Sequence, residues 1–319
     1  MKVVYNETLF PKFQDFGLEI PLLPQRFQNI LSLVKERGWD SKEVSLDELS
    51  LPTDEELLLF HSKEYIDSLK EAGSPAILKC FEFIDEKGNL LYCRKLPEDE
   101  SVARIYEYVL KQVEAVKFSA ELALKEKAVY FLGGGMHHAR KKYGHGFCLV
   151  NDVAYSISKI KEKIDQKKFL IIDVDAHLGD GNLDLLEGRD DVEIIDFYMK
   201  DAWPFNVEGY DLPKITELSR GFNLENQKDY LDKLKEVLGS LHSEELGFCF
   251  IIHGADAYEK DELSSSQTLK LSEKEILERD MMIENYLLDK DIPRLYVTAG
   301  GYGRFAHEVS NQFLEKVFE

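Results

Sequence analysis

Apolar side chains recur with helical spacing in several segments of this chain. In residues 27–34 they return every three to four positions, and the pattern stops at Gly38, a common helix terminator. Thr53 followed by Glu56 forms a capping box, which is typical of a helix start. The same spacing predicts four further helices, over residues 105–120, 153–164, 230–241 and 283–288.

Short uninterrupted apolar runs separate these segments and predict buried strands. The runs cover residues 128–132, 169–172, 192–195, 248–252 and 295–298. Strands that alternate with helices are typical of a parallel sheet, which helices cover on both faces and which places ligands beyond the carboxyl ends of its strands. No repeat, low-complexity tract or Ser/Gly-rich linker divides the chain. We therefore expect one α/β domain over residues 1–319, with a central, mostly parallel sheet.

The composition excludes several protein classes. Hydrophobic residues make up 44% of the 319, enough for a sizeable core and unlike a disordered or fibrous chain. Lys and Arg number 40 against 60 Asp and Glu, so the net charge of -20 repels nucleic acids and anionic membranes. We expect no direct nucleic-acid or membrane partner. A cationic partner fits the charge, although acidity of this kind also serves solubility alone.

The cysteines and the N-terminal segment indicate a reducing compartment. Four cysteines lie far apart without a C-x-x-C pair: Cys80, Cys93, Cys148 and Cys249. This spacing predicts neither a zinc ribbon nor a disulfide framework. Glu7 and Pro11 come before any apolar run long enough for a signal peptide, and no stretch of about 18 apolar residues occurs. We expect a cytoplasmic location, and the sequence does not indicate an oligomeric state.

Two adjacent histidines follow the first long helix and the strand after it. The run 128–132 leads into three glycines and then His137 and His138. A triple glycine could cradle phosphate, but the G-x-G-x-x-G spacing of a dinucleotide site is absent. We therefore do not expect a nucleotide site, and the two imidazoles remain as candidate chemistry.

Polar side chains also converge after the next two buried strands. Asp173, Asp175 and His177 follow the run 169–172, and period-two alternation sends all three to one side. Buried polar groups need a partner, and a divalent metal is the simplest one; the alternative is a helix cap in which the carboxylates accept N–H bonds. Asp256 follows 248–252 at an equivalent depth. Asp175, His177 and Asp256 would leave one coordination position open, as in catalytic zinc sites.

Two further residues at strand ends have alternative interpretations. His253 competes for a ligand role, but we expect a partly buried histidine that bonds to the backbone. After 295–298 come Gly300, Gly301 and Tyr302. The glycines allow the backbone to approach a ligand and let the phenol point into the same crevice, whereas an isolated tyrosine is usually a packing residue.

Taken in chain order, these motifs resemble the zinc-dependent histone deacetylases and their bacterial relatives, the acetylpolyamine amidohydrolases and acetoin-utilisation-type proteins. The resemblance extends from Val3 to about His307 and rests on four motifs, at residues 134–139, 146–148 with 151–152, 173–181, and 254–256 with 300–302. The runs 171–177 and 297–302 look most like the class IV branch. The resemblance implies the three-layer arginase-deacetylase fold, an α/β fold with a central, mostly parallel sheet.

The resemblance also implies a role for each matched residue. His138 matches the general base that activates the attacking water and later protonates the leaving amine, and His137 matches its electrostatic neighbour. Asp173 and Asp180 match the carboxylates that orient His137 and His138, respectively. Tyr302 matches the phenol that polarises the scissile carbonyl and holds the oxyanion.

The implied ligands and channel residues complete the set. Asp175, His177 and Asp256 match the ligands of one zinc ion, with iron(II) as the alternative because two ligands are oxygens. The channel for the acyl-lysine side chain corresponds to Gly146, Phe147 and Trp203, with Phe205 or Tyr210 as alternatives to the tryptophan. Arg26 resembles the arginine of the product-release cavity, and its alternative is a surface arginine that opens a helix. Asp196 and Phe197, with Asp173, resemble part of a potassium or sodium site.

The activity implied is hydrolysis of an N-acyl amide, with acyl-lysine in a protein as the first substrate and an acylated polyamine as the alternative. The chain departs from the family pattern at Leu178, where the commoner form has a second histidine, and no residue matches the rim aspartate that holds the substrate backbone. A two-manganese ureohydrolase would need an acid at Gly179. An acyl-lysine reader without catalysis would not need His137, His138 and Tyr302.

Overall fold

The computed structural model describes residues 1–20, 22–207 and 209–319. Its centre is an eight-stranded sheet with the strand order β2-β1-β3-β8-β7-β4-β5-β6. All the pairings between these strands are parallel, so the expectation of a mostly parallel sheet is confirmed. The strands are β1 (Lys2–Tyr5), β2 (Ser41–Glu43), β3 (Ala128–Phe131), β4 (Lys168–Asp173), β5 (Val192–Met199), β6 (Arg220–Phe222), β7 (Leu246–Ile252) and β8 (Arg294–Val297).

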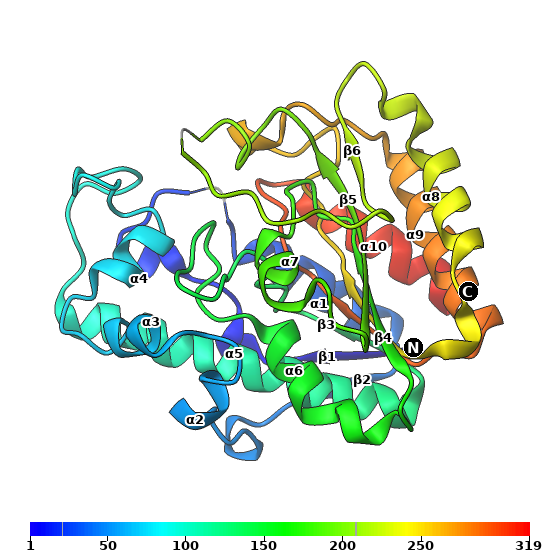
Figure 1. Cartoon of the computed structure of the whole chain (residues 1–319), viewed down its shortest axis with the longest axis horizontal. Coiled ribbons are helices and arrows are strands. Elements are labelled where there is room, and N and C mark those ends of the chain that lie inside the picture. Colours follow the sequence, from blue (N-terminus) through cyan, green and yellow to red (C-terminus); the bar gives the residue numbers. More distant parts are fainter. Residues whose placement is uncertain (21, 208) are drawn as a thin grey trace.

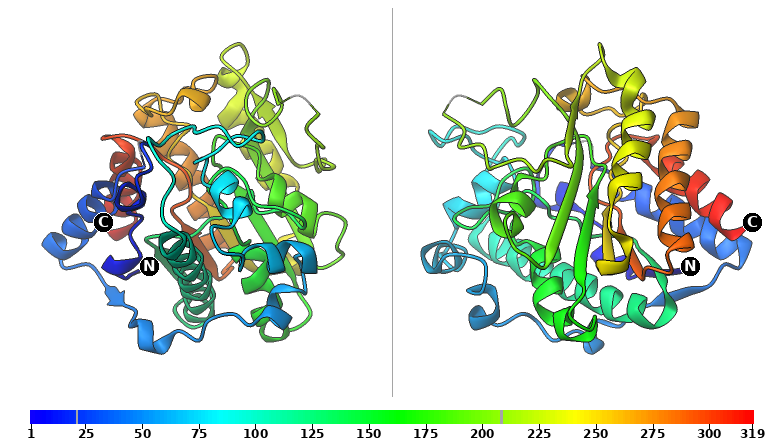
Figure 2. Two further views of the ribbon diagram at one scale, coloured as in Figure 1. Left: turned by 90° about the vertical axis from the view of Figure 1, so that its left-hand side faces the viewer. Right: turned by 45° about the vertical axis from the view of Figure 1, so that its right-hand side comes forward.

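Helices cover both faces of the sheet (Figures 1 and 2). They are α1 (Gln25–Arg37), α2 (Asp54–Leu57), α3 (Lys63–Ser68), α4 (Pro75–Cys80), α5 (Asp99–Glu126), α6 (Asp152–Ile160), α7 (Asp180–Leu186), α8 (Tyr230–Ser240), α9 (Glu273–Asp289) and α10 (Ala306–Phe318). The helices and strands expected from apolar spacing are all present, and α5 is longer than its pattern predicted. Helix α1 ends as expected at Gly38, whose φ of 65° is left-handed.

Alternate strand residues divide the core into two layers. Tyr130, Leu170 and Ile251 pack with α1, α8, α9 and α10, whereas their strand neighbours Phe131 and Ile171 pack with α5, α6 and α7. This period-two alternation is what a sheet buried on both faces requires. A third apolar cluster lies under α2, α3 and α4, against the first half of α5. The architecture is therefore a three-layer α/β arrangement, as the resemblance to the family implies.

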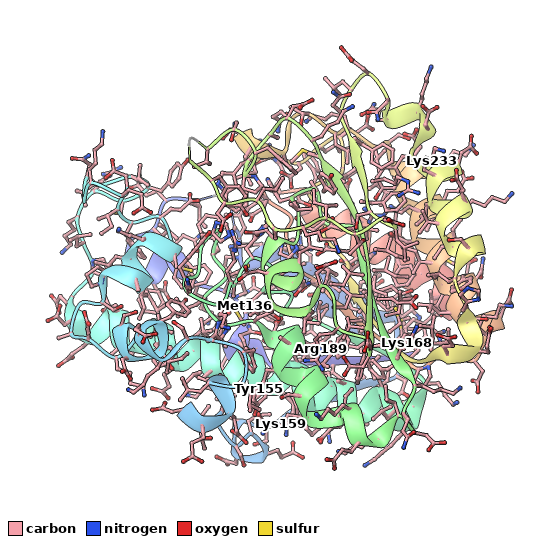
Figure 3. The ribbon with its side chains drawn as sticks, viewed as in Figure 1. Met136, Tyr155, Lys159, Lys168, Arg189 and Lys233 are labelled. Atoms are coloured by element: carbon pink, nitrogen blue, oxygen red, sulfur yellow. The ribbon has the colours of Figure 1, made fainter. Side chains whose placement is uncertain are left out.

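Charged side chains form ion pairs at the amino end of the sheet. Lys168 lies at the start of β4 (Figure 3) and pairs with Glu193 and Glu245 at 3.1 and 2.6 Å. The polar strand ends considered above lie at the opposite, carboxyl end of β4. Among the described residues, we find no helix that combines the length and the apolar character of a bilayer-spanning segment.

Candidate active site

Asp175, His177 and Asp256 form a compact cluster beyond the carboxyl ends of β4 and β7, which are neighbours in the sheet. All three side chains are buried, and one donor atom of each lies within 4.8 Å of the others. His177 Nδ1 is 2.8 Å from Asp256 Oδ2 and 3.4 Å from Asp175 Oδ1. The strand ends therefore bring together the three residues that the sequence singled out as ligands.

The electrostatics of this cluster fit a bound cation. Burial raises the pKa of Asp256, and repulsion from Asp175 raises it further, because two carboxylates are crowded together. Burial would lower the pKa of His177, yet hydrogen bonds and negative charge from Asp175 and Asp256 raise it to about 10. The cluster thus attracts positive charge strongly. Two carboxylate oxygens and one imidazole nitrogen are a donor set suited to a divalent zinc or iron ion.

Backbone groups hold the two carboxylates in place. Asp175 Oδ2 accepts a hydrogen bond from the Gly300 N–H at 2.8 Å, and Asp256 Oδ1 accepts one from the Ala176 N–H at 2.8 Å. A Cβ atom on Gly300 would lie only 2.8 Å from Asp256 Oδ2, so a larger residue there would displace a carboxylate. The glycine after β8 is therefore required by the close approach of the backbone to this cluster.

Two histidine–carboxylate pairs lie beside the cluster. His137 Nδ1 is 2.7 Å from Asp173 Oδ2, and His138 Nδ1 is 2.8 Å from Asp180 Oδ1. The two rings are 3.9 Å apart, centre to centre, and both side chains are buried. A carboxylate at Nδ1 leaves Nε2 of each ring free to face another group. Asp180 opens α7, so that helix fixes the second pair.

The two imidazoles have opposite proton affinities. Burial would lower the pKa of His137, but the charges of Asp173 and Asp175 and the hydrogen bond with Asp173 raise it to about 10. Burial and the positive charge of His137 lower the pKa of His138 to about 3, against the opposing effect of Asp180. Neighbouring groups whose pKa values are pushed apart are typical of acid–base sites. Here His138 is the neutral member of the pair, with a free site for a proton, whereas His137 carries its proton.

Tyr302 lies across from the histidines, after β8. Its backbone N–H donates to Asp261 Oδ2 at 2.7 Å, and its ring lies 6.4 Å from that of Phe147. Burial raises the pKa of Tyr302 well above the ordinary value, and the charges of Asp256 and Asp175 add to the effect. The phenol therefore keeps its proton and remains a hydrogen-bond donor.

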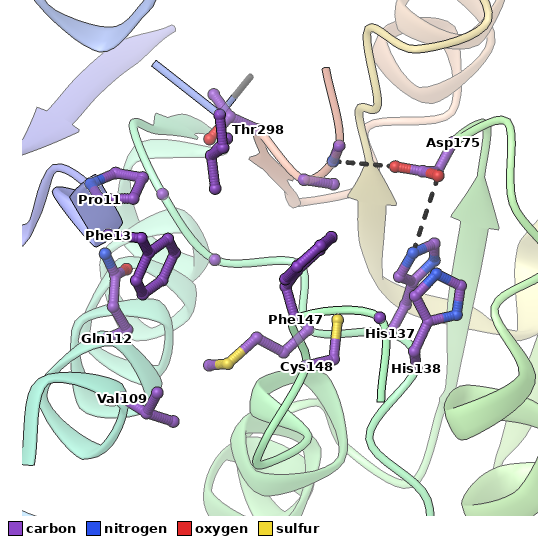
Figure 4. A pocket seen from close by; sticks show the side chains of 18 of the residues that line it. Pro11, Phe13, Val109, Gln112, His137, His138, Phe147, Cys148, Asp175 and Thr298 are labelled. Carbon is purple, nitrogen blue, oxygen red and sulfur yellow. Dashed lines mark hydrogen bonds and ion pairs between the residues drawn. The ribbon is translucent and has the colours of Figure 1, made fainter. Parts of the chain in front are cut away.

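Two cavities meet at these residues. The outer one, of about 270 Å³, and the inner one, of about 110 Å³, share part of their lining: His138, Gly146, Phe147, His177 and Tyr302. The inner cavity has an apolar end that includes Pro11, Phe13 and Val109, while His137, His138 and Asp175 lie at the other end (Figure 4). The chemistry-bearing side chains thus stand between an outer entrance and an inner chamber.

The expected channel residues all line the outer cavity. Gly146 has φ of 53°, and a Cβ atom there would lie 2.7 Å from the Trp203 ring and 2.8 Å from His138. Phe147 and Trp203 form walls of this cavity. The two alternatives to Trp203 lie elsewhere. Phe205 stacks on Tyr198, with ring centres 5.4 Å apart, and the Tyr210 hydroxyl donates to Asp180 Oδ2.

Arg26 is buried, so the alternative of a surface arginine is wrong. Its guanidinium donates to the carbonyl oxygens of Thr298, Ala299 and Gly301 at 2.7, 2.9 and 3.3 Å. It therefore lies behind the loop that carries Tyr302, and it is absent from the described lining of both cavities. Its Nε has no hydrogen-bond partner among the described residues.

The residues expected at the monovalent-cation site also lie together. Asp173 and Asp196 are opposite each other on β4 and β5, and Asp196 Oδ2 accepts the Gly179 N–H at 2.7 Å. Asp196 Oδ1 is buried and has no hydrogen-bond partner within the described part of the chain. Burial, with repulsion from Asp173, raises the pKa of Asp196 well above its usual value. The Phe197 ring points away and stacks on Phe222, so only its backbone is available to a cation.

The expectation for His253 is wrong. Its side chain is fully buried and contacts other side chains, with Nδ1 2.9 Å from the Tyr130 hydroxyl and Nε2 2.9 Å from Asp280 Oδ2. The alternation that turned it away from the ligand cluster was correct. However, strand β3 and helix α9 supply polar partners that the sequence around His253 could not reveal.

No pattern in the sequence singled out His145, although it lies at the site. Its Nε2 is 2.7 Å from Asp180 Oδ2, the carboxylate that also contacts His138. The only signal was its place directly before the Gly146-Phe147 motif. An isolated histidine in a loop has no periodicity that would indicate its neighbours.

Comparison with known proteins identifies the family of the chain. A family model described as "Histone deacetylase domain" matches residues 20–317. Histone deacetylase 2 of Arabidopsis thaliana is 28% identical over 320 residues, which cover 99% of this chain and 78% of that protein. Acetoin utilization protein AcuC of Staphylococcus aureus (strain MRSA252) is 32% identical over 133 residues. That alignment covers 41% of this chain and 32% of the AcuC protein, less than two thirds of its length.

A solved structure shares the fold. The structure titled "Crystal Structure of HDA15 HD domain" superimposes with a TM-score of 0.71, covering 99% of this chain and 88% of that one, at 17% identity. The likeness supports the three-layer architecture. The family model spans nearly all of the chain, and the resemblance indicated by the four sequence motifs is confirmed. This chain belongs to the histone deacetylase family.

Proposed function

We propose that this chain hydrolyses the amide bond of N-acylated primary amines, with acyl-lysine in proteins as its main substrate. One observation carries the proposal: His138, His177 and Tyr302 line both cavities at the point where they meet. A proton acceptor, a cation ligand and a hydroxyl donor are the groups that hydrolysis of a neutral amide needs. Because they come from strand ends across the sheet, we propose residues 1–319 as one catalytic domain.

The proposed metal is a single zinc ion, with iron(II) as the alternative, held by Asp175, His177 and Asp256. Such an ion would supply Lewis acidity toward the scissile carbonyl and the attacking water. The crowding of Asp175 and Asp256 beside His177 supports this assignment, because these buried acids need a compensating charge.

His138 is the proposed general base. Its pKa of about 3 leaves it neutral at physiological pH, so Nε2 accepts a proton from water and later delivers it to the leaving amine. Asp180 at Nδ1 keeps the other nitrogen protonated. His137, with its pKa raised to about 10 beside Asp173, stays cationic and stabilises developing negative charge.

Tyr302 is the proposed oxyanion donor. Its raised pKa keeps the hydroxyl protonated, and because Tyr302 lines both cavities, a carbonyl that entered from outside would lie beside it. A donor fixed before the reaction stabilises the charge of the tetrahedral species without reorganising at the moment of reaction. The Asp261 contact to its backbone supports that fixed position.

The two cavities have separate proposed roles. Phe147 and Trp203 would flank the methylene chain of the amine, and Gly146 leaves room between them. The inner cavity would receive the acyl group and its carboxylate product. Arg26 would act from behind, by holding the 298–301 loop that closes this cavity.

A potassium or sodium ion is proposed beside the catalytic residues. Asp173, Asp196 and the backbone of Phe197 would hold it, and the unpartnered Asp196 Oδ1 supports the assignment. Such an ion would balance the buried acids and stiffen the segment between Asp173 and the ligands. This role is structural rather than chemical.

An acylated polyamine is the second candidate substrate. Glu19, Glu82 and Glu262 line the outer cavity, and no Lys or Arg occurs in its described lining. Glu19 pairs with Arg94 and Glu262 with Arg304, both at 2.9 Å. These arginines offset two of the three charges, and Glu82 has no ion pair among the described residues. Its charge would favour a cationic molecule, and both a lysine within a basic protein and a polyamine would satisfy it.

A panel of substrates tests the proposal. The metal-loaded chain is assayed for amine release from acetyl-lysine peptides, longer-chain acyl-lysine peptides and acetylated polyamines. We expect turnover of acyl-lysine peptides, with a higher kcat/KM than for polyamines. A clear preference for the polyamines would replace the first substrate by the second, and turnover of neither class would refute the amidohydrolase function.

A further inference from the structure

His145 has no part in the mechanism proposed above, yet it contacts the carboxylate that orients His138. Asp180 Oδ1 lies 2.8 Å from His138 Nδ1, and Asp180 Oδ2 lies 2.7 Å from His145 Nε2. A single buried carboxylate therefore bridges two imidazoles. The outer imidazole is one that the family motifs quoted above do not include.

The loop holds His145 in a fixed position. Cys148 N–H donates to the His145 carbonyl at 2.9 Å, and the two residues between them, Gly146 and Phe147, have φ of 53° and 65°. Positive φ at both central residues is what a type I′ turn requires. A Cβ atom on Gly144 would lie 3.0 Å from the Leu149 Cα, so the chain is also confined on the other side.

Aromatic rings confine the imidazole of His145. Its ring centre lies 5.1 Å from that of Trp203, 5.3 Å from Tyr143 and 6.2 Å from Tyr210, and 20% of the side chain is exposed. The Tyr210 hydroxyl donates a hydrogen bond to Asp180 Oδ2, the oxygen that His145 also contacts. Asp180 Oδ2 thus receives two donors from the solvent side, and Oδ1 is left to His138.

This arrangement keeps Asp180 ionised and oriented. Burial would raise the pKa of its carboxyl, but the charge of His145 and the hydrogen bonds from His138 and His145 hold it well below the usual range. A fully buried carboxylate with a donor on each oxygen has little freedom to rotate. The two donors to Oδ2, His145 and Tyr210, therefore orient the carboxylate so that Oδ1 contacts His138.

We propose that His145 is a positioning residue: its Nε2–H bond to Asp180 Oδ2 fixes Oδ1 on the Nδ1–H of His138 and so keeps His138 Nε2 as the proton acceptor. This inference rests on the proposed function for the role of His138, but the hydrogen-bond relay itself does not depend on substrate or metal.

Kinetics of the metal-loaded chain test the relay. His145→Phe should lower kcat by about 10-fold with KM unchanged, the lower end of the range for outer partners of catalytic groups. His145→Gln should stay within about threefold of wild type, because its amide N–H donates to the same carboxylate. In an Asp180→Asn background, His145→Phe should not lower kcat any further, because both changes disrupt the same hydrogen-bond relay. His242→Phe, at an exposed histidine, is the matched control and should leave kcat unchanged.

A second readout separates this inference from the proposed function. In protein with ¹⁵N-labelled histidine, the His138 signals should report Nδ1–H in wild type and His145→Gln, and a mixture of tautomers in His145→Phe. Unchanged tautomers in His145→Phe, equal loss in the phenylalanine and glutamine variants, or a change confined to KM would overturn the relay. A wild-type chain without amidase activity would refute the proposed function alone, since the tautomer signals would still decide the inference.

Discussion

At the scale of single residues, the site combines a neutral imidazole with a phenol that holds its proton. Burial lowers the pKa of His138, the carboxylates beside His137 raise its pKa in spite of burial, and burial raises the pKa of Tyr302. At neutral pH, His138 can therefore accept a proton and Tyr302 can donate a hydrogen bond. The microenvironment of each group decides its role.

Replacing Tyr302 by phenylalanine tests the donor directly. The change removes one oxygen and retains the ring that packs near Phe147, so substrate binding should persist. We expect kcat to fall by about 100-fold, the usual cost of one oxyanion donor, with KM nearly constant. Steady-state kinetics on an acyl-lysine peptide measure both. Tyr286→Phe, outside the described lining of both cavities, is the control; an unchanged kcat in Tyr302→Phe would remove the donor role.

Ordered motifs made most site residues predictable from the sequence. Asp175 and His177 stand at alternate positions after β4, Asp256 follows the neighbouring β7, and the three lie in one cluster, as that placement predicted. His145 and His253 escaped prediction because their partners come from α7 and α9, distant in sequence. Contacts between residues so far apart in the chain leave no periodic pattern in the sequence.

At the scale of elements, apolar periodicity predicted most of the long helices and buried strands, but not the inner strand β1, the helix α10 or the two edge strands. β2 reads Ser-Lys-Glu and β6 reads Arg-Gly-Phe, so neither carries an apolar run. Polar and short edge strands are expected in a sheet that must not pair with other chains. Helix α7 escaped as well, because its Asp and Gly residues serve the site rather than a periodic face.

Helix α9 links two of the ligand-bearing loops through Arg279. Its guanidinium donates to the Val174 carbonyl at 3.0 Å and to the Gly254 carbonyl at 3.4 Å, next to the ligand segments, and pairs with Asp280 at 2.8 Å. Arg279→Met would leave buried Asp280 without its arginine. We expect a loss of about 3 kcal/mol in the free energy of unfolding and weaker metal binding.

Denaturant titration of the metal-free and the loaded protein measures this effect. The paired change Arg279→Met with Asp280→Leu should recover part of the stability, because no lone charge is left buried. A loss below about 0.5 kcal/mol for Arg279→Met would contradict the role of α9 in holding the two loops.

His61 links the loop after α2 to the start of α6. Its Nδ1 donates to the Arg140 carbonyl at 2.9 Å, its Nε2 accepts the Asn151 N–H at 3.2 Å, and burial lowers its pKa to about 4. The unfolded chain therefore takes up a proton below about pH 6.5 that the folded chain does not. The contribution of neutral His61 to the free energy of unfolding is therefore fully present above about pH 6.5 and is lost as the pH falls toward about 4.

His61→Gln isolates that effect. Between about pH 7.5 and about pH 5.5, the variant should lose about 1.3 kcal/mol less stability than wild type, although it starts lower because a buried hydrogen bond is disturbed. The free energy of unfolding at the two pH values is the measurement. Equal pH dependence in both proteins would show that His61 is not buried in its neutral form.

At the scale of the whole molecule, the net charge of -20 divides into two parts. Four acids, Asp173, Asp175, Asp180 and Asp256, are buried at the site, and their charge is balanced locally by imidazoles and the proposed cations. Most of the remaining acids are at least partly exposed, although others are also buried, among them Asp152, Asp196, Asp280, Glu114 and Glu284. Glu19, Glu82 and Glu262 line the entrance, where they would favour a positively charged substrate. Composition alone could not separate these two parts, because only the fold brings the buried acids together.

Metal-dependent release of amine from an acetyl-lysine peptide is the most direct test of the central proposal. The chain is stripped with a chelator, dialysed, and titrated with zinc while amine release and bound metal are measured together. We predict that hydrolysis is lost on stripping and returns in full at about one zinc ion per chain. Undiminished hydrolysis by the metal-free chain, or a requirement for two manganese ions per chain, would contradict the proposal.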